Sequence, residues 1–198
     1  MKTTKKKGFT LIELIVVIAI IGVLAAILVP TMLGYVRKSK LSSANSTASS
    51  VYKAINSALT ELDEEGIDIG GDLYIKYASG AWASTGTPST DTLKGNMGSG
   101  KKFDTKVKNF FQDIDKAKGG VQASVMNGSC VAVAVASDST YTGTYPAGVV
   151  TSDNYNTYKG STKLPDALKK AVIVASGGKE SDTSVKDTTY KAALDAIK

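Results

Sequence analysis

The sequence contains no histidine and a single cysteine, Cys130. Without histidine, a Ser-His-Asp triad, a histidine-ligated metal and imidazole acid–base catalysis are all excluded. One cysteine cannot form an intramolecular disulfide, which is unusual for a small exported domain. No segment matches a nucleophile motif, and the acidic run over residues 63–72 lacks the spacing of a calcium loop. We therefore expect a protein that is not an enzyme and that needs no cofactor or metal.

Positive charge is concentrated at the N-terminus. The 198 residues carry a formal net charge of +6. Lys2, Lys5, Lys6 and Lys7 lie within the first eight residues, and without them the side chains number 20 basic and 18 acidic. The basic balance therefore belongs mainly to this short segment and argues against a nucleic-acid partner.

A long apolar run follows the lysines. From Phe9 to Val29 it is 21 residues long and is interrupted only by Thr10, Glu13 and Gly22. As a helix it would span about 30 Å, the thickness of a bilayer hydrocarbon core. Lysines immediately before such a span stay in the cytoplasm, so the rest of the chain would lie outside. The pattern predicts a single-pass protein of the cytoplasmic membrane with its N-terminus inside.

Two simpler membrane signals are alternatives. An ordinary secretory signal peptide has a shorter apolar region, about 7–15 residues, and a small-x-small cleavage site, which is missing here before Pro30. A plain signal anchor is the second alternative, but it leaves Glu13 unexplained.

Glu13 is an acid within an apolar span. Its insertion costs about 2.5–3.5 kcal/mol, and such residues normally have a partner. No Lys, Arg or His occurs from Gly8 to Val36. If the chain were cut between Gly8 and Phe9, the new α-amine of Phe9 could meet Glu13 of a neighbouring subunit. Otherwise Glu13 lies near the interface and extends to water.

These features together resemble a known family. The Lys-rich leader, Gly8, Phe9-Thr10-Leu11-Ile12-Glu13 and the apolar run ending at Pro30 resemble the class III signal of type IV prepilins and pseudopilins. The resemblance covers about residues 5–34. The chain lacks the cysteine pair that is common near the C-terminus of Gram-negative pilins, and this points to a Gram-positive or otherwise divergent source.

The resemblance implies a processing and assembly pathway. A membrane prepilin peptidase would cut after Gly8 and methylate Phe9, and Glu13 with Phe9 would mediate subunit docking. The pilus assembly machinery of the cytoplasmic membrane would then build a helical homo-oligomer, an extracellular filament.

The helix is expected to continue beyond the membrane to about Glu65. Apolar residues recur at steps of three and four, which predicts an amphipathic half, and Gly66 is a natural stop. The residues at these steps are Ala44, Ala48, Val51, Ile55, Ala58, Leu59 and Leu62. Pro30 removes a backbone donor and should kink the helix, with Gly22 and Gly34 as softer points.

The remainder predicts an α+β domain. Strands are expected at Leu73–Tyr77 and in a hairpin, Val121–Val135, turning at Asn127-Gly128 with Cys130 buried beside the turn. A helix is expected from Phe103 to Ala117, and a helical tail from Asp187. Residues 164–175 could form a strand or a short helix. Two stretches, 79–102 and 137–163, are interpreted as loops.

The expected architecture is the pilin fold, a long helical spine packed on an antiparallel sheet. It has four segments: a leader at 1–8, a transmembrane and filament-core half-helix at 9–36, an amphipathic half-helix at 37–65, and an extracellular domain at 66–198.

Two functions remain open. The first is a pilus subunit that serves adhesion, aggregation or twitching motility. The second is a pseudopilin of a type II secretion or DNA-uptake system, but the Trp-Gly-x-Pro-Tyr-like segment of the major secretion pseudopilins is not found.

Aromatic residues in polar sequence could contact a glycan or a cell surface, or they could pack over the sheet edge. They are Trp82, Tyr141, Tyr145, Tyr155 and Tyr158. Glycosylation sequons begin at Asn45 and Asn127.

Overall fold

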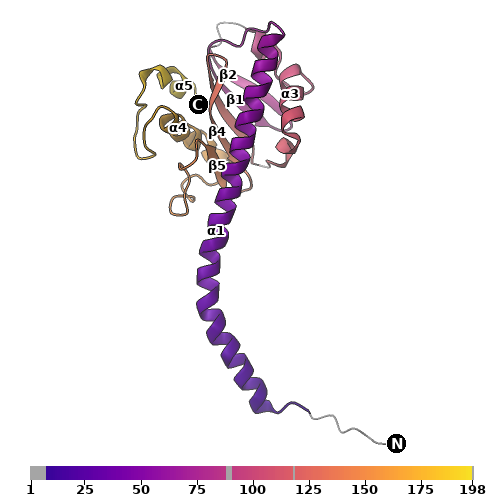
Figure 1. Ribbon diagram of the computed structural model, residues 1–198, viewed down its shortest axis with the longest axis vertical. Coiled ribbons are helices and arrows are strands. Elements are labelled where there is room, and N and C mark those ends of the chain that lie inside the picture. The colour runs from indigo at the N-terminus through magenta and orange to yellow at the C-terminus, as the bar shows by residue number, and fades with distance from the viewer. Residues whose placement is uncertain (1–7, 88–90, 118, 198) are drawn as a thin grey trace, which may run out of the picture. The chain divides into compact units, whose positions relative to one another are not determined.

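A computed structural model describes residues 8–87, 91–117 and 119–197 (Figure 1). The chain divides into two compact units, Met1–Lys38 and Ser39–Lys198. Helix α1 begins at Leu11 in the first unit and ends at Glu64 in the second. Most of the expected leader, residues 1–7, lies outside the described residues.

The second unit holds a five-stranded sheet. Its further elements are β1 (Asp72–Ala78), β2 (Ala81–Thr87), α2 (Asp91–Gly95), α3 (Lys102–Phe110), β3 (Val121–Met126), β4 (Ser129–Ala136), β5 (Thr142–Tyr145), α4 (Leu164–Ala175) and α5 (Lys191–Asp195), with 3₁₀ turns at Gln112–Lys116, Ser161–Lys163 and Thr188–Tyr190. The strand order is β2-β1-β3-β4-β5, and every neighbouring pair is antiparallel. The expected α+β architecture is confirmed.

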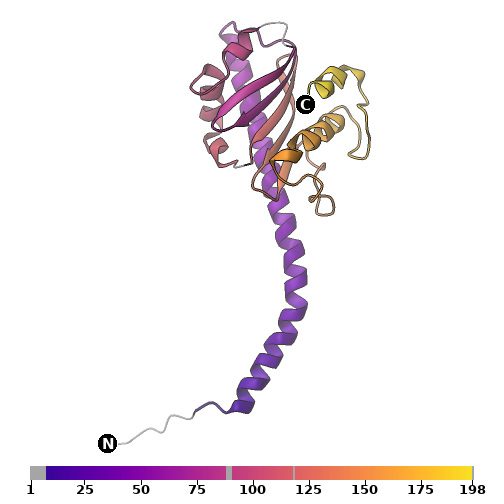
Figure 2. The same cartoon turned by 180° about the vertical axis from the view of Figure 1, so that it is seen from behind.

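Helices cover both faces of the sheet. Figures 1 and 2 show α3 and residues 39–64 of α1 on one side of the sheet, and α4 and α5 on the other. Alternate residues of β1 and β3, such as Ile75 and Ala123, point into the core beneath α1. Their neighbours on the opposite face, such as Tyr74, pack in a second core with α4 and Ile197. The sheet is therefore the middle of three layers, and both its faces hold buried residues, while Lys76 of β1 and Ala83 of β2 are exposed.

The buried stripe of α1 follows the expected spacing. All seven stripe residues are buried, and Leu41 and Ala54 join them. The helix ends as the sequence predicts: Gly66 has φ +77°, its N–H donates to the Asp63 carbonyl at 2.8 Å, and the Ile67 N–H donates to the Leu62 carbonyl at 3.0 Å. This pair of bonds is a Schellman motif, and it satisfies carbonyls that a helix end leaves open.

The expected hairpin is also present. Strands β3 and β4 join through Asn127 and Gly128, which both have positive φ, as a type I′ turn requires. Cys130 is buried next to the turn, and desolvation raises the pKa of its thiol, so it stays protonated. Asn56 of α1 fixes this end of the sheet, because its Oδ1 accepts the Cys130 N–H at 3.0 Å.

Two strands lie in segments that the sequence predicted as loops. The N–H of Trp82 in β2 donates to the buried carboxylate of Asp104 at 3.2 Å, so a side chain from α3 supports this strand. In β5, Gly143 lies against α1, where a Cβ would come within 2.0 Å of the Ala44 carbonyl oxygen. Both strands are therefore stabilised by contacts from far along the sequence.

The prediction for residues 103–117 is wrong at its end. Helix α3 stops at Phe110, because Phe111 has φ −142° and ψ 85°, and a 3₁₀ turn follows. The tighter turn buries Ile114 and leaves Phe110 48% exposed. Residues 164–175, which could have been strand or helix, form helix α4.

Candidate processing and assembly site

The N-terminal end of α1 is capped by reciprocal hydrogen bonds between Thr10 and Glu13. The backbone N–H and hydroxyl of Thr10 donate to Oε2 of Glu13 at 2.9 and 2.6 Å. The Glu13 N–H donates to Oγ1 of Thr10 at 3.3 Å. This is a capping box, Thr-x-x-Glu, which satisfies donors that a helix start leaves open.

The capping box changes the interpretation of Glu13. The sequence holds no cation in the span that could neutralise Glu13, but its Thr-x-x-Glu spacing is the signature of this capping box. Thr10 supplies neutral donors, so the carboxylate still has no cation among the described residues of the first unit. Both residues follow the expected cut after Gly8, so cleavage would leave the capping box intact.

Gly8 and Phe9 lie before the helix and are exposed. Phe9 is 86% exposed, and a Cβ at Gly8 would meet nothing within 4 Å. The bond between them is therefore open to approach.

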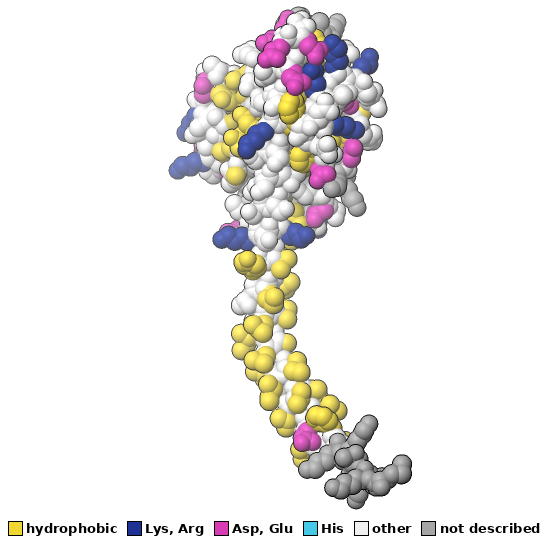
Figure 3. Space-filling model, turned by 45° about the vertical axis from the view of Figure 1, so that its right-hand side comes forward, with side chains coloured by type: hydrophobic (Ala, Val, Ile, Leu, Met, Phe, Trp, Pro, Cys, Tyr) yellow, Lys and Arg dark blue, Asp and Glu magenta, His cyan; other side chains and the backbone are white. Residues whose placement is uncertain are grey.

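Residues 11–36 expose an almost entirely apolar surface. Their large hydrophobic side chains, from Leu11 to Val36, are all about half exposed or more. Figure 3 shows hydrophobic side chains over the visible face of this segment. Among the described residues, one helix, α1, is long and apolar enough to cross a membrane, by length and composition.

The three residues expected to kink α1 lie within continuous helix. Gly22, Pro30 and Gly34 all have helical backbone. Beside Pro30, the Thr31 hydroxyl donates to the Leu28 carbonyl at 2.8 Å. Pro30 still removes the donor for the carbonyl four residues earlier, so local weakening there stays a prediction.

The aromatic residues do not form one exposed group. Trp82 and Tyr158 are only 2% and 4% exposed, so their prediction as surface residues is wrong. Trp82 packs edge-on against Phe103, with ring centroids 5.4 Å apart. The others are half-buried: Tyr145 packs on Tyr52 of α1, and Tyr141 stacks on Tyr155. Most of their ring surface therefore serves packing.

The two sequons lie in different settings. Oδ1 of Asn45 accepts the Thr144 N–H at 2.9 Å, so this side chain joins α1 to β5. Asn127 is exposed at the hairpin turn.

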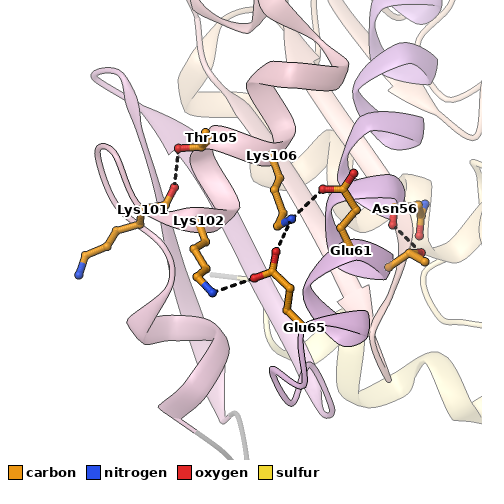
Figure 4. Close-up of polar contacts among 8 residues, drawn as sticks. Asn56, Glu61, Glu65, Lys101, Lys102, Thr105 and Lys106 are labelled. Atoms are coloured by element: carbon orange, nitrogen blue, oxygen red, sulfur yellow. Dashed lines mark hydrogen bonds and ion pairs between the residues drawn. The ribbon is translucent and has the colours of Figure 1, made fainter.

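Glu65, near the start of the acidic run, and Glu61, just before the run, belong to an ion-pair network. Lys106 of α3 bridges Glu61 and Glu65 at 2.8 and 2.7 Å, and Lys102 reaches Glu65 at 2.7 Å (Figure 4). The hydrogen bonds from the two lysines lower the pKa of Glu65 to about 2. Part of the run thus ties the end of α1 to α3. No cluster of three potential metal ligands occurs in the described parts of the chain.

Comparisons with known proteins point to one family. Residues 3–29 match the model of the prokaryotic N-terminal methylation motif. The type IV major pilin protein PilA of Myxococcus xanthus is 44% identical over 59 residues, which is 30% of this chain and 27% of that protein. The type IV major fimbrial protein FimA of Dichelobacter nodosus is 37% identical over 93 residues, 47% of this chain and 59% of that protein. A fimbrial protein of Pseudomonas aeruginosa is 46% identical over 56 residues, 28% of this chain and 36% of that protein.

The matches to these three relatives span between about a quarter and three fifths of their lengths. No solved structure matches the chain significantly. The methylation motif, the named relatives and the helix packed on an antiparallel sheet agree with one another. Together they support the type IV pilin family as the family of this chain.

Proposed function

We propose that the chain is the structural subunit of a type IV pilus, made as a membrane-anchored precursor and polymerised into a surface filament. Its relatives are named as major pilins and fimbrial proteins, which supports a structural rather than an enzymatic role. Adhesion, aggregation or twitching motility would be functions of the whole filament.

The observation that carries the proposal is the exposed apolar surface of residues 11–36. The second unit already buries the stripe of α1 that faces the sheet, in a core with residues such as Ile55 and Val125. Among residues 8–38, the described part of the first unit, nothing covers the apolar surface in this way. Apolar surface in water costs about 25 cal/mol per Å², so this segment needs lipid before assembly and helices of other copies afterwards.

The N-terminal end of the apolar segment suits a precursor that is first anchored in the membrane and later released into the filament. The lysines before Gly8 would hold the precursor with its N-terminus inside the cytoplasm. Prepilin peptidase would remove them and methylate Phe9. The new Phe9 amine would then provide the cation that Glu13 lacks, supplied by a neighbouring subunit in the filament.

Two measurements test this function. Intact mass and N-terminal sequencing of the surface protein should give a chain that begins at Phe9 with a methylated amine. A start beyond Val29 would restore the ordinary signal peptide. Electron microscopy of cells without the protein should show that filaments are lost. Intact filaments together with lost secretion or DNA uptake would instead identify a pseudopilin.

A further inference from the structure

Helix α4 presents two stripes of side chains. One stripe faces the sheet and is fully buried, with Leu168 and Val172 among its members. The other consists of Asp166, Lys169, Lys170 and Ile173, at helical steps of three, one and three, and lines a cavity of about 610 Å³. This volume lies within the range of small-molecule sites. We call it the α4–α5 cavity.

The cavity has a partly apolar wall. Leu194 and Ile197, at and just after the end of α5, line it together with Ile173 and Tyr158. The Tyr158 hydroxyl donates to Oε1 of Glu180 at 2.5 Å, which fixes the ring against the loop that follows α4. Tyr158, Ile173 and Ile197 are only 3–4% exposed, so Leu194 contributes most of the apolar surface that a ligand can reach.

The two lysines of the stripe differ in their partners. The ammonium group of Lys170 donates to the backbone carbonyls of Glu180 and Asp182 at 2.6 and 2.8 Å, so it holds the loop. Lys169 makes no hydrogen bond or ion pair with the residues that the structure describes. It therefore brings to the cavity a positive charge that no described carboxylate pairs with directly.

The rim carries hydrogen-bonding oxygens. Asp166 and Asp195 line the cavity and make ion pairs with Lys163 and Lys191, at 3.1 and 2.9 Å. A carboxylate has about four acceptor positions, so each keeps capacity for a ligand. The side chains of Thr157 and Thr183 add hydroxyl groups.

We propose that the α4–α5 cavity binds a sugar acid, such as a uronic or sialic acid residue of a surface glycan. The ligand's carboxylate would pair with Lys169, its hydroxyls would donate to Asp166 and Asp195, and the C–H face of its ring would lie on Leu194. A neutral sugar would leave the Lys169 charge unpaired. A small carboxylate without a ring would leave the apolar wall uncovered, and a fatty acid would bring no donors to the aspartates.

The test uses the full chain in detergent micelles, so it does not depend on filament formation or on the proposed function. Calorimetric titrations compare two sugar acids, 3′-sialyllactose and glucuronic acid, with lactose and glutarate. At least one sugar acid should bind at least tenfold more tightly than lactose and glutarate. Absence of sugar-acid binding, or equal binding of lactose or glutarate, overturns the proposal.

Variants assign the binding to the cavity. Lys169→Met should weaken sugar-acid binding at least tenfold, while Lys169→Arg, which keeps the charge, should retain most of it. Lys94→Met removes an exposed lysine that does not line the cavity and serves as the matched control. Circular dichroism verifies that each variant is folded. Unchanged binding in Lys169→Met, or an equal loss in Lys94→Met, would place the ligand elsewhere and reject the site.

Discussion

The two parts of helix α1 share one backbone conformation and differ in their surroundings. In residues 11–36 every side chain is exposed, whereas nine residues between Leu41 and Leu62 are buried. Apolar residues occur on all sides of the first part, so no single sheet could cover them. In the second part they form one stripe, which one sheet covers. A helix that is apolar all round thus needs an apolar environment, whereas a striped helix needs one neighbour.

The two parts of α1 also differ in how closely neighbouring residues approach the helix backbone. The buried stripe of the second part includes four alanines, and Gly143 of β5 lies directly against the Ala44 backbone. Such contacts are specific to one partner surface. The first part has branched side chains such as Ile15 and Val16, all exposed, and they suit lipid chains as well as other helices. We therefore expect changes in the first part to affect assembly and changes in the second to affect folding.

The largest effect is expected at Glu13. Glu13→Ala should be produced, inserted and cut after Gly8 at near-normal levels, yet build no filaments when it is the sole subunit. The Phe9 amine of a neighbour would lack a counter-ion, and an unpaired buried charge costs several kcal/mol at every added subunit. One antibody, applied to the sheared-surface and membrane fractions, measures the yield.

Glu13→Gln separates charge from capping. Glutamine can close the same capping box with Thr10 but carries no charge. If docking needs the carboxylate, Glu13→Gln fails like Glu13→Ala. Normal filament yield from Glu13→Gln beside failure of Glu13→Ala would mean that the capping box, and not an ion pair, is what assembly requires.

Truncation should separate the two parts of the helix. We expect a chain that begins at Arg37 to be a soluble monomer with its fold intact, because the buried stripe begins at Leu41. Circular dichroism and sedimentation are the measurements. An unfolded product would show that residues before Arg37 contribute to the stability of the second unit.

The sequence predicted those elements whose signals are local. The stripe of α1 and the Asn127-Gly128 turn follow from spacing and turn chemistry within a few residues. Strand β5 depends on Asn45, whose amide holds Thr144 from 99 positions away. No periodicity in a four-residue strand that contains Gly143 could indicate that contact.

The same distinction applies to the candidate sites. Gly8, Phe9 and Glu13 could be predicted as candidates because the motif is contiguous. The capping box is equally local, because its Thr-x-x-Glu signature lies within four residues. The α4–α5 cavity could not be predicted from the sequence, because Thr157, Lys169 and Leu194 come together only in the folded chain.

A smaller effect is expected from Gly143→Ala. The added Cβ would come within 2.0 Å of the Ala44 carbonyl oxygen, which is backbone and cannot rotate away. Helix and strand must separate, at a cost of about 3 kcal/mol, the upper end for overpacking. Thermal unfolding of the full chain in micelles measures the change. Gly95→Ala, where a Cβ meets nothing within 4 Å, is the control, and equal stability of the two variants would refute the close contact.

The smallest effect is expected at the ion pairs between α1 and α3. Hydrogen bonds from Lys102 and Lys106 lower the pKa of Glu65 from an ordinary 4.5 to about 2. A depressed pKa stabilises the fold above the ordinary value, and this contribution is lost as pH falls from 4.5 towards 2. The wild-type Tm should therefore exceed that of Glu65→Gln at pH 6 by only about 1–2 °C, because exposed ion pairs contribute little. At pH 2 the difference should shrink.

Glu64→Gln, an exposed neighbour in the last turn of α1, is the control and should match wild type at both pH values. A difference between wild type and Glu65→Gln that persists undiminished at pH 2 would show that Glu65 acts through packing, and that its charge does not join the two helices.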